Sequence, residues 1–167
     1  MKIGFIGTGH ITKSVINGIL GSKLKINKIL ISKRSNKISA ALKKKSKKIT
    51  ILNDNQEIIN KSNWVFLAVT PEVGHKILPK LKFKKNKTII SFISTIKMSD
   101  LKKYVKVNSK IVRAIPLPPI SIRKGPVPIF PPNKKVKQFF DHLGTTVEIK
   151  KENLSLNFWS TSSMMAP

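Results

Sequence analysis

The chain has 167 residues, enough for one hydrophobic core and therefore one domain, and it contains no cysteine, which excludes disulfides and thiolate metal sites and fits a reducing, cytoplasmic location. No apolar run approaches the roughly 20 residues that a membrane span needs. The formal net charge is +26, but all but three of the 33 basic residues are lysines spread along the chain, a pattern more typical of a solvated surface than of a nucleic-acid interface.

Short apolar runs alternate with helix-like segments from the N-terminus onward. Residues 2–7 are predicted to form a buried strand, and residues 10–20 a helix that ends at Gly21. Further strands are expected at 28–32, 49–52, 64–69, 88–93 and 110–115, and further helices at 36–45, 54–61, from Thr70-Pro71 onward and at 98–104. Asp54 with Glu57 predicts a capping box. This alternation predicts a Rossmann-type, doubly wound α/β fold: a mostly parallel sheet with helices on both faces.

The amino-acid composition changes after residue 115. Residues 116–132 hold seven of the ten prolines, which predicts an extended loop with at most one edge strand near 127–130. A helix over 133–144 and a strand over 145–150 then complete a nucleotide-binding domain that is expected to cover residues 1–152.

The first strand leads into a glycine loop, "GTGHIT", which opens the first helix. In such a loop Gly7 makes the tight turn, and Gly9 lets the backbone approach a dinucleotide pyrophosphate at the helix N-terminus. Thr12 stands where a third glycine is usual. We expect Gly7, Thr8, Gly9, His10 and Ile11 to contact the cofactor, the alternative being a tight turn that binds nothing.

The end of the second strand distinguishes between cofactors. NAD sites usually place an acidic residue there to bind the ribose 2′-hydroxyl. This chain has Ser32, Lys33, Arg34 and Ser35 instead, and two cations with two hydroxyls suit a 2′-phosphate. NADP(H) is therefore expected rather than NAD(H), although Lys33 is also one of many lysines.

Taken together, "IGFIGTG", "SKRS", "NQEIINKSNWVFLAVTP", "VRAIPLPP" and "STSS" resemble the pyrroline-5-carboxylate reductase family, the last enzyme of proline biosynthesis. The resemblance places Asn55 near the adenosine, and Ala68, Val69, Thr70 and Pro71 under the nicotinamide ribose. It places Ser91, Pro116, Leu117, Pro118 and Pro119 on the substrate side. Thr70 replaces a family lysine, Leu117 replaces a family asparagine, and residues 160–166 only partly match the family's SGSGPA-like motif.

The resemblance implies an NADP-dependent oxidoreductase that transfers a hydride to the C=N carbon of a small cyclic imine. No catalytic protein residue is identified. No metal is expected either, because His10, His75 and His142 are scattered without metal-ligand spacing. One departure from the family motifs, Leu117, lies on the substrate side, so a related reductase of another imine or carbonyl compound is an alternative.

In the family the chain continues into a helical dimerisation domain. Residues 153–167 would be the start of that domain, so we expect this chain to be an N-terminal fragment that forms a homodimer or higher oligomer through the missing part. Two interpretations from other classes remain: a non-catalytic NADP(H)-binding sensor, and a nucleic-acid-binding module that uses the lysine-rich surface.

Overall fold

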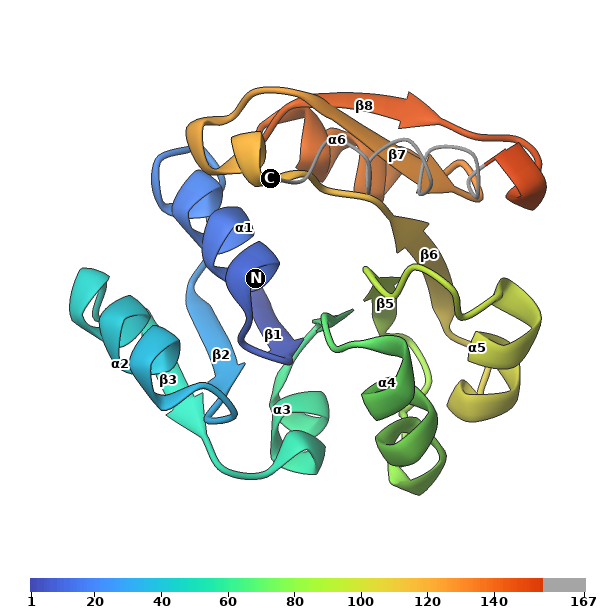
Figure 1. Ribbon diagram of the computed structural model, residues 1–167, viewed down its shortest axis with the longest axis horizontal. Coiled ribbons are helices and arrows are strands. Elements are labelled where there is room, and N and C mark those ends of the chain that lie inside the picture. The colour runs from blue at the N-terminus through green and yellow to red at the C-terminus, as the bar shows by residue number, and fades with distance from the viewer. Residues whose placement is uncertain (155–167) are drawn as a thin grey trace.

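The computed structural model describes residues 1–154, and within them eight strands form one sheet in the order β3-β2-β1-β4-β5-β6-β7-β8 (Figure 1). The first six strands run parallel and are β1 (Lys2–Ile6), β2 (Lys28–Ser32), β3 (Ile49–Leu52), β4 (Trp64–Leu67), β5 (Thr88–Ser91) and β6 (Lys110–Ala114). The helices between them are α1 (His10–Leu20), α2 (Asn36–Lys45), α3 (Asn55–Lys61), α4 (Pro71–Ile77) with the 3-10 turn η1 (Leu78–Lys80), and α5 (Met98–Val105). The predicted doubly wound α/β fold is confirmed.

Helices cover both faces of the sheet, because the strands bury apolar side chains on both sides. On one face α1, α2 and α6 (Lys134–Asp141) enclose a core in which the rings of Phe5 and Phe66 stack with centroids 4.5 Å apart. On the other face α3 and α5 pack against a second cluster that includes Ile6 and Leu67. Near-continuous apolar strands are what a parallel sheet buried on both faces requires.

Five strands end earlier than the sequence predicted, β1 by one residue and β8 by two among them. β4 ends at Leu67, β5 at Ser91 and β6 at Ala114, at the edge of the sheet where the chain turns into its loops. Apolar residues that follow β5 and β6 are still buried, whereas Ala68 and Val69 after β4 are half-buried; Ile93, for example, joins the α3–α5 core cluster without belonging to a strand. Burial continues past the last paired residue, so hydrophobicity alone does not locate a strand's end.

The prediction of an edge strand near residues 127–130 was wrong. β7 (Pro126–Phe130) lies between β6, to which it is antiparallel, and β8 (Thr145–Glu148), to which it is parallel. Backbone groups alternate sides along a strand, and the Pro128 carbonyl accepts from Ile115 N on the β6 side. Pro126 and Pro128, which lack an N–H, therefore both face β6, with which β7 forms only two residue pairs. The residues of β7 that face β8 keep their N–H groups. A proline-rich strand can therefore be internal.

The rest of the proline-rich segment also differs from an extended loop. Pro118–Ile122 form a 3-10 turn, η2, that packs against α1. The close approach depends on Gly18 of α1, where an added Cβ would lie 2.4 Å from the Ile120 carbonyl oxygen.

The predicted helix caps form only in part. Asp54 accepts a hydrogen bond from Gln56 N at 2.9 Å, as an N-cap should, but Glu57 pairs with Lys61 instead of completing the capping box. Thr70 occupies the N-cap position of α4 with Pro71 at the first helical position, and its side chain makes no capping bond.

A buried ion pair ties the chain beyond β8 to the sheet. Arg113 of β6 is 1% exposed, and its Nη1 donates to Glu152 Oε1 at 2.6 Å. Its Nη2 donates to the Ser94 carbonyl at 2.5 Å, while Met98 N at the start of α5 donates to the same Glu152 oxygen at 2.7 Å. One side-chain pair thus joins β6, the loop after β5 and the segment at Glu152. The domain boundary at residue 152 itself stays a prediction.

None of the helices within residues 1–154 has the length and apolar character of a membrane span.

Candidate cofactor-binding site

Most of the predicted cofactor residues lie together at the carboxyl edge of β1, β2 and β4. The strand order reverses between β1 and β4, and this switch point is where doubly wound sheets bind ligands. Two adjoining hollows of about 370 and 230 Å³ lie here and share Gly7, Arg34 and Val69. We call them together the cleft. Its other lining residues are Thr8, Gly9, Ser32, Lys33, Ser35, Asn36, Asn53, Asn55, Ala68, Thr70, Val73 and Ile77.

Gly7 and Gly9 differ in whether the fold itself requires glycine at that position. Gly7 has φ +100°, and a Cβ there would lie 2.2 Å from the Ala68 carbonyl oxygen, so the fold itself requires glycine. An added Cβ at Gly9 would meet no heavy atom of residues 1–154 within 4 Å. Within that part of the chain, packing does not require glycine at residue 9, and the space beside it opens into the cleft.

Thr12, at the position of the missing third glycine, fits without opening the loop. Its side chain is fully buried, and its hydroxyl donates to the Gly7 carbonyl at 2.8 Å. The N-cap of α1 is Gly9, no side chain caps the helix, and its first turn contains no acidic residue. The positive end of an 11-residue helix therefore stays available to an anion in the cleft.

A second set of hydroxyl contacts connects the glycine loop to the end of β2. Gly7 N donates to Ser32 Oγ at 3.0 Å, and the Thr8 hydroxyl donates to the Ser32 carbonyl at 2.6 Å. The Thr8 and Ser32 hydroxyl oxygens are themselves 3.1 Å apart. Ser32 lines the cleft while its hydroxyl already contacts the glycine loop, and its role in binding the cofactor stays a prediction.

The cleft is basic at the end formed by the residues after β2. Lys33 and Arg34 are exposed, Ser35 is half-buried, and no acidic residue lines either hollow of the described chain. Asn36 and Asn53 lie beside them and were not predicted. Asn53 directly follows β3, so the rule that ligands bind beyond the carboxyl ends of parallel strands could have found it.

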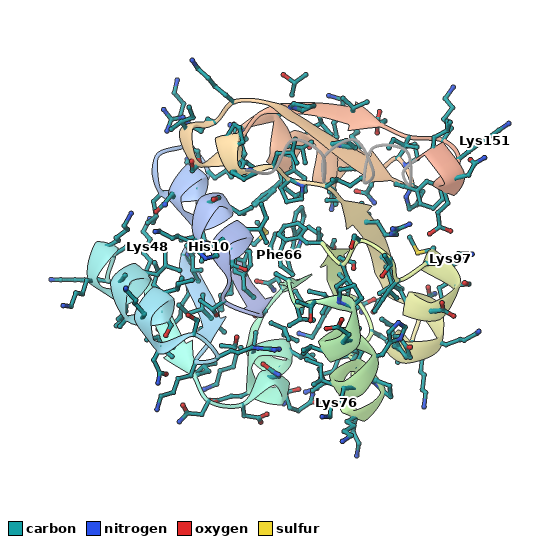
Figure 2. The ribbon with its side chains drawn as sticks, in the orientation of Figure 1. His10, Lys48, Phe66, Lys76, Lys97 and Lys151 are labelled. Atoms are coloured by element: carbon teal, nitrogen blue, oxygen red, sulfur yellow. The ribbon has the colours of Figure 1, made fainter. Side chains whose placement is uncertain are left out.

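Three predicted cofactor residues do not line the cleft. His10 begins α1 and is exposed (Figure 2). Ile11 is half-buried against the core, and Pro71 is the first residue of α4. By contrast, Asn55, Ala68, Val69 and Thr70 all line it.

The residues assigned to the substrate side lie elsewhere. Ser91 is fully buried, and its hydroxyl accepts a hydrogen bond from Ile93 N at 3.2 Å. Pro116 is buried and Leu117 half-buried, whereas Pro118 and Pro119 begin η2 and are exposed. None of the five lines the cleft, and their substrate role stays a prediction. The "STSS" motif lies outside the described residues.

Other polar features do not converge on a site. In the chain up to residue 154, no group of three His, Asp or Glu side chains could hold a metal ion. His75 Nδ1 lies 2.6 Å from the Tyr104 hydroxyl, away from the cleft lining. The labelled lysines Lys48, Lys76, Lys97 and Lys151 lie at separate points around the molecule in Figure 2, in line with a solvated surface.

Comparison with known families agrees with this geometry. The family model described as "NADP oxidoreductase coenzyme F420-dependent" matches residues 2–95, more than half of the chain and all of the cleft lining. The chain belongs to this family.

Proteins similar to the chain bear out the resemblance noted from its motifs. Pyrroline-5-carboxylate reductase 3 of Danio rerio is 28% identical over 128 residues, which are 75% of this chain and 44% of the relative. The 1-pyrroline-5-carboxylate reductase of Streptococcus pyogenes has the same fold, with a TM-score of 0.82 at 23% identity over 97% of this chain and 62% of that one. The Plasmodium falciparum pyrroline carboxylate reductase, solved with NADP bound, has a TM-score of 0.75 at 22% identity over 92% of this chain and 59% of that one. The chain therefore spans less than half of the Danio rerio relative's length.

Proposed function

We propose that this chain is the NADP(H)-binding part of a reductase of the pyrroline-5-carboxylate reductase type. The observation that carries the proposal is the cleft at the β1–β4 switch point, which has a glycine loop and an uncapped helix N-terminus near Lys33 and Arg34. The NADP-bound Plasmodium falciparum relative, of the same fold, supports it.

The residues present suit a dinucleotide with a 2′-phosphate. The open space beside Gly9 leaves room for a pyrophosphate close to the backbone, and the N-terminus of α1 supplies the partial positive charge. Lys33, Arg34 and Ser35 would hold the 2′-phosphate by charge-assisted hydrogen bonds. Ala68, Val69 and Thr70, after β4, would flank the nicotinamide ribose.

The chemistry belongs to the cofactor, which supplies a hydride to the C=N carbon of the imine when it is bound. The chain's own contribution is to bind and orient. The wall after β4 is mainly apolar and includes Val69 and Val73, and an apolar wall limits the access of water to that side of the cleft. A protein nucleophile has no part in this scheme.

Cofactor titration tests the proposal directly. The fluorescence of the reduced nicotinamide should show that NADPH binds more tightly than NADH, because only NADPH has a phosphate for Lys33 and Arg34. Equal affinities would contradict the assignment of NADP(H), and failure to bind either cofactor would contradict the proposal as a whole.

Turnover needs a second experiment. Hydride transfer requires the imine carbon to be held about 3 to 3.5 Å from the nicotinamide, and the resemblance assigns half of that positioning to a helical domain. We expect little NADPH oxidation with pyrroline-5-carboxylate from the 167-residue chain. A chimera that adds the part of the Streptococcus pyogenes enzyme beyond the matched region should turn over. Cofactor binding without turnover in the chimera, for that imine and for other cyclic imines or carbonyl compounds, would favour a non-catalytic sensor.

We further propose a cytoplasmic homodimer. The cysteine-free composition suits a reducing compartment, and the resemblance assigns dimer formation to the helical domain. Light scattering on the chimera should give the mass of a dimer or a higher oligomer, and a monomer would contradict this assignment.

A further inference from the structure

The Thr8 and Ser32 hydroxyls form a bridge between the two phosphate-binding loops of the cleft. Thr8 is 2% exposed and belongs to the glycine loop, and Ser32 is 6% exposed and is the last residue of β2. Gly7 N, Thr8 Oγ1, Ser32 Oγ and the Ser32 carbonyl together make the three contacts of 3.0, 2.6 and 3.1 Å described above. We call this group the hydroxyl bridge.

The direction of each hydrogen bond in the bridge follows from proton counting. A hydroxyl group carries one proton, and a carbonyl oxygen carries none. The Thr8 proton therefore goes to the Ser32 carbonyl, which can only accept. The contact between the two hydroxyl oxygens then requires Ser32 to be the donor and Thr8 the acceptor. Ser32 Oγ accepts from Gly7 N at the same time, so its only proton is committed within the protein.

This assignment changes the role of Ser32. A phosphate oxygen accepts hydrogen bonds, so a serine that binds phosphate must offer its proton, and the Ser32 proton is already donated to Thr8. Resting on the proposed function, we propose that Thr8 and Ser32 are positioning residues: the hydroxyl bridge fixes the glycine loop relative to residues 33–35, and Ser32 does not bind the 2′-phosphate. Selectivity for NADP(H) then depends on Lys33, Arg34 and Ser35, the residues beyond the bridge.

The local backbone supports a positioning role. Gly7 is held on both sides, since its N–H donates to Ser32 and its carbonyl accepts from Thr12. On the other side of Ser32, Lys33 N donates to the Leu52 carbonyl at the end of β3 at 3.1 Å. The bridge thus joins the ends of β1 and β2 at the point where a dinucleotide must reach from one loop to the other.

The test compares Ser32→Ala with Ser35→Ala, using NADPH, NADH and adenosine 2′-monophosphate as probes. The last carries the 2′-phosphate without the pyrophosphate. Ser32→Ala removes both hydrogen bonds of the Ser32 hydroxyl, so it should weaken NADPH and NADH by the same factor, about fivefold to tenfold, and should leave the affinity for adenosine 2′-monophosphate within twofold. Ser35→Ala should weaken NADPH and adenosine 2′-monophosphate but not NADH.

Two substitutions of Thr8 provide the control for general destabilisation. Thr8→Val keeps the shape and removes the hydroxyl, so it should reproduce the effect of Ser32→Ala, whereas Thr8→Ser keeps the hydroxyl and should bind both dinucleotides within twofold of the parent. Selective loss of NADPH and adenosine 2′-monophosphate in Ser32→Ala, or unchanged binding in Thr8→Val, would overturn the inference while the proposed function stands. A parent protein that binds neither dinucleotide would overturn both.

Discussion

Two regions along one edge of the sheet use their polar groups in opposite ways. After β1 and β2, exposed Lys33 and Arg34 and the uncapped start of α1 lie at an open cleft. At the ends of β5 and β6, Ser91 is buried and Arg113 is bound by Glu152 and by the Ser94 carbonyl. We assign the first region to ligand binding, whereas the contacts of the second region hold segments of the chain together. Substitutions should therefore change cofactor affinity in one region and stability in the other.

The largest effect on stability is expected from Arg113→Met. Removing the guanidinium from this buried ion pair should cost about 3 kcal/mol of unfolding free energy, at the low end of the usual range because the Glu152 side chain is 27% exposed. Urea denaturation measures the loss. NADPH affinity should stay within twofold, because Arg113 does not line the cleft.

Lys103→Met is the matched control for Arg113→Met. Lys103 pairs with Asp100 at 3.2 Å, but the two side chains are 75% and 36% exposed, so the pair should contribute less than about 1 kcal/mol. If the two variants lose equal stability, or if Arg113→Met weakens NADPH, the distinction between the two regions fails.

In the cleft, Gly9→Val should give the largest loss of affinity. The side chain would enter the open space that we assign to the pyrophosphate, so NADPH and NADH should both bind at least about 100-fold more weakly, or about 2.7 kcal/mol. The melting temperature should fall by only a few degrees, since a Cβ at Gly9 contacts nothing and its φ of −97° suits any residue.

Gly7→Ala is the contrasting variant in the same loop, because it should destabilise the fold whereas Gly9→Val should mainly reduce cofactor affinity. The added Cβ at Gly7 would lie 2.2 Å from the Ala68 carbonyl oxygen at a positive φ, so this variant should lose stability as well as binding. If Gly9→Val keeps the parent's affinity, the assignment of the glycine loop to the pyrophosphate is wrong.

The prediction for the basic end of the cleft concerns selectivity. Lys33→Ala together with Arg34→Ala should weaken NADPH by about 1.5 to 3 kcal/mol for each charge-assisted hydrogen bond lost, and should leave NADH nearly unchanged. Parallel fluorescence titrations at constant salt measure both affinities. Lys44→Ala with Lys45→Ala, on the exposed end of α2, removes the same charge away from the cleft. An equal loss of NADPH affinity in that control would mean that only the overall charge matters.

The sequence predicted the parallel part of the fold well, for a physical reason. Apolar runs, the glycine after α1 and the Asp54 cap are local signals, and the structure places a strand or helix at each of them. β7 was mispredicted because proline removes a hydrogen-bond donor on one side of a strand only, and which side matters depends on the neighbours. Local signals do not contain that information.

The same limit applies to the cleft. Gly7 directly follows β1 and Lys33 directly follows β2, so the glycine-loop motif and the position at the end of the second strand identified them. Val73 and Ile77 were missed because the side of α4 that faces the cleft depends on how the helix packs. The second role of Ser32 was missed because its partner, Thr8, is 24 residues away in the sequence.

The smallest effect is expected from Leu117→Asn, which restores the asparagine of the family pattern. Leu117 is half-buried at the start of η2, and its carbonyl accepts from Ile120 N at 2.9 Å, a backbone contact that asparagine can keep. Asparagine is also a favourable residue at such a cap, which offsets part of the lost apolar contact. We expect the free energy of unfolding to change by less than about 1 kcal/mol and the NADPH affinity to stay within twofold, because residue 117 lies outside the cleft. Leu117→Ala is the control that loses the apolar contact without gaining a polar group. If Leu117→Asn alone changes NADPH affinity by more than fivefold, the loop before η2 belongs to the cofactor site, and the two regions compared here act as one.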